Sequence, residues 1–187
     1  MSLGKRRGLR LICGALFLGM LAGCAVVKPG RLLPPEALGL TCTSDDICFD
    51  DVSRQSEAER LTQDALAFVE NRFGPIKDPP RIYFCSTNAC FAQFGDPRVS
   101  GLYFWATQDI AIIDKGWRSH IGRHELIHHW QNETYGMVQA GNGLPRWYIE
   151  GMAYVFSEDP RPVIPNEKAQ GQRARFKQWI DAGNDWQ

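Results

Sequence analysis

The sequence lacks any surplus of charge. It holds 21 Lys and Arg residues against 21 Asp and Glu residues, and four of the cations lie in the first ten residues. The remainder carries 17 cations against 21 anions and has no basic stripe. Proteins that bind nucleic acid concentrate Lys and Arg on one face. The composition therefore argues against a nucleic-acid partner.

Long hydrophobic runs are also missing. The most apolar stretch, residues 11–21, has eleven residues, whereas a membrane-spanning helix needs about 20. It follows Lys5, Arg6, Arg7 and Arg10 and ends in small residues, which is the pattern of a secretory signal peptide. The sequence contains no internal repeat and no low-complexity segment. An exported chain with one ordinary domain is therefore predicted.

The end of the apolar run, Leu21-Ala22-Gly23-Cys24, resembles the lipobox of bacterial lipoproteins. The resemblance implies cleavage before Cys24 and acyl chains on that cysteine. Because Ala25 rather than Asp follows, it also implies an outer-membrane lipoprotein that faces the periplasm. An ordinary signal peptide with a chance cysteine is the alternative.

The segment after the predicted lipidation site is rich in Pro and Gly and has no periodic apolar face, which is typical of a tether. We therefore expect a signal peptide over residues 1–23, a lipidated N-terminus and tether over 24–40, and one domain over 41–187.

Cysteine is scarce in the predicted domain, which contains Cys42, Cys48, Cys85 and Cys90. Neither close pair has the C-x-x-C spacing that structural zinc sites favour, so a zinc site made of all four is the weaker interpretation. Three disulfide pairings are open. The short loops favour Cys42–Cys48 and Cys85–Cys90, both compatible with an oxidising periplasm.

Helical and β-rich segments follow one another along the chain, which predicts an α+β fold in a single domain. Residues 101–114 are rich in β-formers and fit either one long strand or a hairpin that turns near 107–109. Ser119 is expected to cap the next helix, and residues 136–143 to form a loop. The expected helices cover about 56–73, 88–94, 119–133, 145–157 and 166–182, and a short strand is expected at Ile82–Cys85.

Histidine is also scarce, but all four copies lie within residues 120–129. Two of them form His124-Glu125-Leu126-Ile127-His128, an H-E-x-x-H motif. Positions i and i+4 share one face of a helix, so His124 and His128 can bind one metal ion. Glu125 lies beside that face, where it can accept a proton from the water that the metal activates.

A hydrolytic zinc ion takes three protein ligands and leaves one position open. Glu150, twenty-two residues after His128, is the favoured third ligand, and Asp159 is the alternative. The metzincin pattern would need Gly and His at the positions that Gln131 and Thr134 occupy here.

The H-E-x-x-H motif followed by Pro145-x-Trp147-x-x-Glu150-Gly151-x-Ala153 resembles the gluzincins, the thermolysin-like zinc metallopeptidases. The resemblance covers about residues 100–158. It implies that His124, His128 and Glu150 bind one Zn2+ and that Glu125 is the general base. It also implies a zincin-like domain with a small sheet packed on the H-E-x-x-H helix and a following Glu-bearing helix. Residues 101–114 would contain an edge strand that pairs with an extended peptide.

Gluzincins commonly place a Tyr or His against the oxyanion of the tetrahedral intermediate, and no motif assigns that residue in this chain. Tyr154 and Tyr148 are candidates, either for stabilising the transition state or for supporting the ligands. Further candidates are Tyr135, Tyr103 and Arg146.

Three neighbouring residues receive simpler interpretations. His120 is expected at the surface or on the substrate side, and His129 is expected to support the ligands or the fold. Gly151 is expected to permit close packing of the glutamate helix on the metal helix.

The predicted function is zinc-dependent hydrolysis of peptide bonds by a lipid-anchored metallopeptidase of the bacterial envelope, acting on a peptide or protein. Cell-wall peptide cross-links are an alternative substrate. The alternative function is a non-enzymatic envelope lipoprotein whose structural or vestigial metal site supports partner binding. Because the chain has little room for a second domain, the cleft is expected to be shallow or completed by a partner.

Overall fold

The computed structural model describes residues 28, 30 and 32–186. The expected signal peptide over 1–23 and the lipidation site Cys24 lie outside these residues. Within the described part of the chain, no helix has both the length and the apolar character needed to cross a bilayer.

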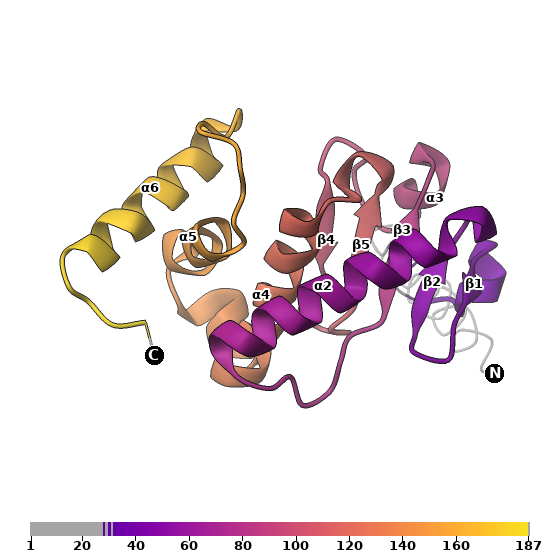
Figure 1. Ribbon diagram of the computed structural model, residues 1–187, viewed down its shortest axis with the longest axis horizontal. Coiled ribbons are helices and arrows are strands. Elements are labelled where there is room, and N and C mark those ends of the chain that lie inside the picture. The colour runs from indigo at the N-terminus through magenta and orange to yellow at the C-terminus, as the bar shows by residue number, and fades with distance from the viewer. Residues whose placement is uncertain (1–27, 29, 31, 187) are drawn as a thin grey trace, which may run out of the picture.

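Five short strands form one mixed sheet in the order β1-β2-β3-β5-β4 (Figure 1). Strands β2, β3 and β5 are parallel, and β1 and β4 join the two edges in antiparallel fashion. Their bounds are Thr41–Cys42, Ile47–Phe49, Ile82–Cys85, Gly101–Tyr103 and Ile110–Ile113 for β1 to β5. Of the two expectations for residues 101–114, the hairpin is therefore confirmed, and its turn contains Gln108 at φ 63°.

Successive side chains of each strand point to opposite faces of the sheet. Both faces are covered by other parts of the chain. In β3, Ile82 and Phe84 belong to the cluster shared with helices α2 (Gln55–Phe73) and α4 (Ser119–Tyr135). Tyr83 and Cys85 belong to the opposite cluster, with α3 (Asn88–Ala92). The predicted α+β fold, with the sheet packed on the H-E-x-x-H helix, agrees with this arrangement.

The second face of the sheet is partly covered by residues that precede β1. A 3-10 turn at Pro35–Leu38 leads into the sheet, and Leu38 and Leu40 are buried in the cluster with α3. The amide of Gly30 also donates to the carbonyl of Gln93 at 2.9 Å. Packed structure therefore begins before residue 41, within the segment expected to be a tether.

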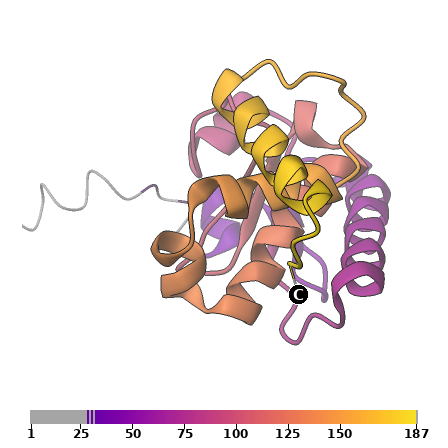
Figure 2. The same ribbon diagram turned by 90° about the vertical axis from the view of Figure 1, so that its left-hand side faces the viewer.

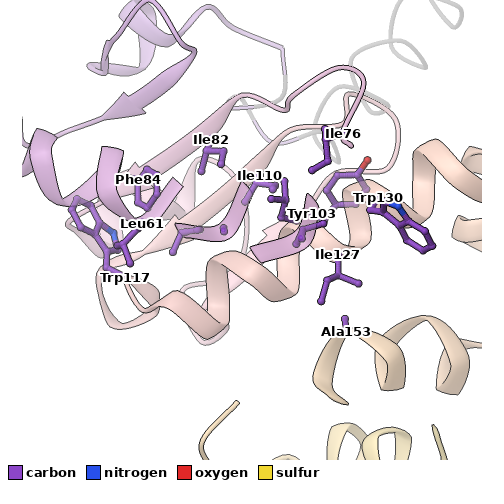
Figure 3. Packing of buried hydrophobic residues seen from close by; sticks show 14 of the residues in the cluster. Leu61, Ile76, Ile82, Phe84, Tyr103, Ile110, Trp117, Ile127, Trp130 and Ala153 are labelled. Atoms are coloured by element: carbon purple, nitrogen blue, oxygen red, sulfur yellow. The ribbon is translucent and has the colours of Figure 1, made fainter. Parts of the chain in front are cut away.

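Helix α4 lies between the sheet and α5 (Arg146–Phe156), as Figure 1 shows, and α6 (Glu167–Asp181) covers α5 (Figure 2). Figure 3 shows Ile127 of α4 between Tyr103 on the sheet side and Ala153 of α5. The expectation that Gly151 packs against the H-E-x-x-H helix is wrong. A Cβ at this position would lie 2.5 Å from the Gln172 carbonyl oxygen on α6. This glycine permits the close approach of α6, not of α4.

The helix ends follow local chemistry with two differences. Asn166 caps α6 by accepting from the Ala169 amide at 3.0 Å. Ser119 is the first residue of α4 rather than its cap, since Arg118 occupies the cap position without a side-chain bond. The segment expected as a loop after α4 contains a π-helical turn at Gln139–Gly143. Further 3-10 turns occupy Val52–Arg54 and Asp114–Gly116.

Two disulfides join Cys42 to Cys48 and Cys85 to Cys90. The expected local pairing is thus confirmed, and the four cysteines do not form a zinc site.

Candidate metal centre

His124, His128 and Glu150 come together at the interface of α4 and α5. Glu150 Oε2 lies 3.7 Å from His124 Nε2 and 3.6 Å from His128 Nε2. One ligand atom from each residue lies within 4.8 Å of the other two, so the group can hold a metal ion. The alternative third ligand, Asp159, is not part of this group.

Helix geometry and packing together produce this convergence. The two histidines are one turn apart, and their ring centroids are 4.8 Å apart. Helix α5 is anchored by Ile149, Met152 and Ala153, which are fully buried. Because Glu150 is adjacent to these positions, its carboxylate reaches the histidines from the second helix.

Gln131 orients the His128 ring. Its amide nitrogen donates to the Ile149 carbonyl at 3.0 Å, so its Oε1 is free to accept from His128 Nδ1 at 2.8 Å. The proton is therefore assigned to Nδ1, which leaves the Nε2 lone pair facing Glu150. In the sequence, Gln131 stands out only as a departure from the metzincin pattern. Its spacing of i+3 from His128 was the available signal.

Arg146 holds the other oxygen of Glu150. Its Nη2 donates to Glu150 Oε1, one helical turn away on α5. Burial alone would raise the pKa of Glu150, but the facing histidines hold it well below its usual range. Burial would likewise lower the pKa of His128, yet the Glu150 carboxylate raises it above the ordinary value. Glu150 thus presents a charged oxygen to both histidines.

Glu125 lies beside the histidines and against the edge strand. Its side chain is buried, and a Cβ on Gly101 of β4 would lie 2.6 Å from its Oε1. Glycine at position 101 therefore leaves room for this carboxylate. Burial raises the pKa of Glu125, and the two histidines oppose the shift. A carboxylate with a raised pKa is a better proton acceptor near neutral pH.

These residues line a cleft of about 630 Å³. One wall comes from residues 98–103, which include β4, and from Trp105, and the floor comes from α4 and α5. The opposite wall includes Ile164, Ala169 and Gln172. This chain therefore supplies a second wall of the cleft itself, through α6 and the loop before it.

The two candidate tyrosines of α5 differ in position. Tyr154 lines the cleft, and its ring centroid lies 4.4 Å from that of His124. Burial raises the pKa of Tyr154 to about 12, so its hydroxyl remains protonated at neutral pH. Tyr148 bonds through its hydroxyl to Tyr135 and to the Trp186 carbonyl, and neither tyrosine of this pair lines the cleft. Tyr154 lies one turn after Glu150, whereas Tyr148 lies on another face of α5.

Of the remaining candidates, Tyr103 and Arg146 both line the cleft. Tyr103 accepts through its hydroxyl from Asn132 Nδ2 at 2.8 Å. Arg146 is engaged with Glu150, as described above.

The two outer histidines have different environments. His120 lines the cleft, with Nε2 4.0 Å from Asp159 Oδ1, which agrees with a substrate-side position. His129 is fully buried, and its Nε2 lies 3.5 Å from Glu133 Oε1. Its ring nitrogens make no hydrogen bond with other described residues. His129 therefore lies in the core.

No protein-family model matches the sequence, and no curated protein or solved structure matches it either. The candidate site is therefore interpreted from its own residues.

Proposed function

We propose that this protein is a zinc metallopeptidase of gluzincin type, anchored by lipid in the bacterial envelope, with a zincin-like catalytic domain. The observation that carries the proposal is the convergence of His124, His128 and Glu150 with Glu125 beside them in an open cleft.

The donor set fits zinc. Two imidazole nitrogens and one carboxylate oxygen are a ligand set that zinc hydrolases use, and they leave one position open. The Nδ1 proton of His128 is held by Gln131, so Nε2 is available as a ligand. Bound there, zinc would supply a Lewis acid that makes water a nucleophile near neutral pH.

The side chains around the ligands supply the other parts of a hydrolytic reaction. Glu125 accepts the proton of the attacking water and delivers it to the leaving amine. Tyr154 donates its hydroxyl proton in a hydrogen bond to the oxygen of the former carbonyl, where negative charge develops. Both side chains line the cleft that holds the metal ligands.

Strand β4 supports recognition of an extended peptide. It is an edge strand and pairs with β5 alone among the strands that the structure describes. Its outer backbone groups can hydrogen-bond an added strand with little dependence on sequence. Because Gly101 of β4 contacts Glu125, a peptide bound there would run past the general base.

The envelope location rests on the predicted signal peptide and on Cys24, and the two disulfides support an oxidising compartment. The substrate is accordingly proposed to be a peptide or protein of the envelope.

The test combines zinc content with hydrolysis. Zinc per chain would be measured by atomic emission for the wild type and for Glu150→Ala and Glu125→Gln, and each protein would be assayed on a quenched fluorescent peptide library. We expect about one zinc in the wild type and in Glu125→Gln, and weakened or lost zinc in Glu150→Ala. Hydrolysis by Glu125→Gln should fall by about 10²- to 10⁴-fold.

Two outcomes would count against the proposal. Absence of zinc from the folded wild type, even after zinc is supplied, would favour the non-enzymatic lipoprotein. Retained activity in Glu125→Gln would remove Glu125 from its role as base.

A further inference from the structure

A second group of polar residues lines the same cleft. It consists of His120 on α4 and Ser157, Asp159 and Arg161, which follow α5. All four line the cleft with the metal ligands. Arg161 and Asp159 are close enough to affect the Tyr154 hydroxyl electrostatically. The group is therefore next to the proposed reaction centre but contains none of its metal ligands.

The cation of this group is more exposed than the anion. Asp159 has only 2% of its side chain exposed, whereas Arg161 has 39% exposed. Arg161 binds Asp159 through Nε and Nη2. Its Nη1 makes no hydrogen bond with any described residue, so three of the five donors remain available, two on Nη1 and one on Nη2. The ion pair thus presents a guanidinium edge with the carboxylate behind it.

Ser157 adds a donor that has no internal use. It is 1% exposed, and its Oγ has no hydrogen-bond partner among the described residues. A buried hydroxyl without a partner costs free energy, so a ligand that supplied an acceptor would recover that cost. His120 lies on the same side of the cleft, with Nε2 4.0 Å from Asp159 Oδ1.

The charges along the rim favour an anion. Lys168, in the first turn of α6, lines the cleft, is exposed and has no ion pair among the described residues. The three carboxylates of the cleft, Glu125, Glu150 and Asp159, are all largely buried. A ligand that enters the cleft therefore meets cations before it meets anions.

We propose that Arg161, with Ser157 and Lys168, forms a subsite for a carboxylate of the substrate close to the scissile bond. The substrate class is then a peptide that carries either an acidic side chain or its C-terminal carboxylate at this point. The guanidinium offers paired N–H donors that match a carboxylate. This inference rests on the proposed peptidase function, because it takes the metal ligands to mark the position of the scissile bond.

The experiment measures binding, so it does not depend on turnover. The purified zinc-loaded protein would be titrated calorimetrically with peptide hydroxamates, whose hydroxamate group binds zinc. One pair differs only by Glu against Gln next to the hydroxamate, and a second pair differs only by a free against an amidated C-terminus. We expect at least one acidic member to bind about 10-fold tighter or more than its neutral partner. The pair that shows the preference identifies the source of the carboxylate.

Three variants separate the subsite from general effects. Arg161→Gln should abolish the preference while the neutral hydroxamates still bind, and Arg161→Lys should retain part of it. Arg98→Gln is the matched control, because Arg98 lines the opposite wall and is 89% exposed, and it should keep the preference.

Equal binding within both pairs in the wild type would overturn the subsite while leaving the zinc site standing. Failure of every hydroxamate to bind would reject the proposed function and the subsite together.

Discussion

Arg146 binds one carboxylate oxygen of Glu150, while the other oxygen of Glu150 faces His124 and His128. The two oxygens therefore have separate partners. A carboxylate held in this way is directed to bind a metal through one oxygen, which leaves a coordination position for water or substrate. Arg146 is in this sense a positioning residue.

Replacing Arg146 tests this role. Arg146→Gln should weaken zinc binding by about 10- to 100-fold, because the support of a ligand is lost. Its stability should change by only about 0.5 kcal/mol, since exposed i,i+4 ion pairs contribute little. Zinc affinity would be measured by chelator competition, and the Co2+ absorption spectrum would report a change in coordination. Lys177→Gln is the control, because Lys177 forms an exposed i,i+4 pair with Asp181 on α6. Equal zinc affinity in the two variants would contradict the role of Arg146.

Tyr154→Phe is expected to lower kcat by about 10²- to 10³-fold and to retain zinc, because it removes one donor to the developing negative charge. Tyr148→Phe is the matched control on the same helix. It loses bonds to Tyr135 and the Trp186 carbonyl, so it should reduce stability by about 1 kcal/mol with kcat near that of the wild type. Steady-state kinetics and thermal unfolding distinguish the two effects. A Tyr154→Phe enzyme with wild-type kcat would show that another group stabilises the transition state.

Gln131→Met keeps the approximate volume of the side chain but leaves His128 Nδ1 and the Ile149 carbonyl without partners. We expect a loss of about 1–3 kcal/mol in the free energy of unfolding and about 10- to 100-fold weaker zinc binding. Urea denaturation of the metal-free protein and chelator competition measure the two quantities. Gln93→Met removes a side-chain bond of 3.4 Å to the Leu38 carbonyl, far along the chain from the candidate ligands, and should leave zinc affinity unchanged. An equal loss of affinity in both variants would mean that the effect is not specific to His128.

Asp64 of α2 joins that helix to α4 through both of its oxygens, which accept from Arg123 at 3.0 and 3.1 Å. The hydrogen bonds from Arg123 lower the pKa of Asp64 below its ordinary value of 3.8. The folded state then binds fewer protons than the unfolded state, so this stabilisation is complete above pH 3.8 and is lost as pH falls through the folded pKa.

Asp64→Asn should therefore lower the free energy of unfolding at pH 7 by up to about 1 kcal/mol. The difference from the wild type should shrink in the acid range below pH 3.8. Urea denaturation at several pH values measures it. Asp181→Asn, on the exposed end of α6, should show a smaller difference at neutral pH. A difference for Asp64→Asn that stays constant down to the acid limit would exclude the Arg123 ion pair as its cause.

The sequence by itself determined the features that depend on short-range geometry. A spacing of four residues places His124 and His128 on one helix face whatever the rest of the chain does. The short loops between cysteines favour the observed disulfides, and the expected helices over 56–73 and 166–182 agree closely with α2 and α6. The candidate third ligand, Glu150, is predicted from the resemblance to a family motif, and the structure brings it to the histidines.

Only the tertiary structure decided which side chains surround the candidate metal ligands. Gly151 lies against α6 rather than α4, and this contact brings α6 close to α5 as a wall of the cleft. The same packing places Tyr148 against the core and leaves Tyr154 and Arg161 in the cleft. Residue spacing specifies positions around one helix axis, but it does not specify how a second helix lies against the first. That relation follows from side-chain volumes that meet across long separations in the chain.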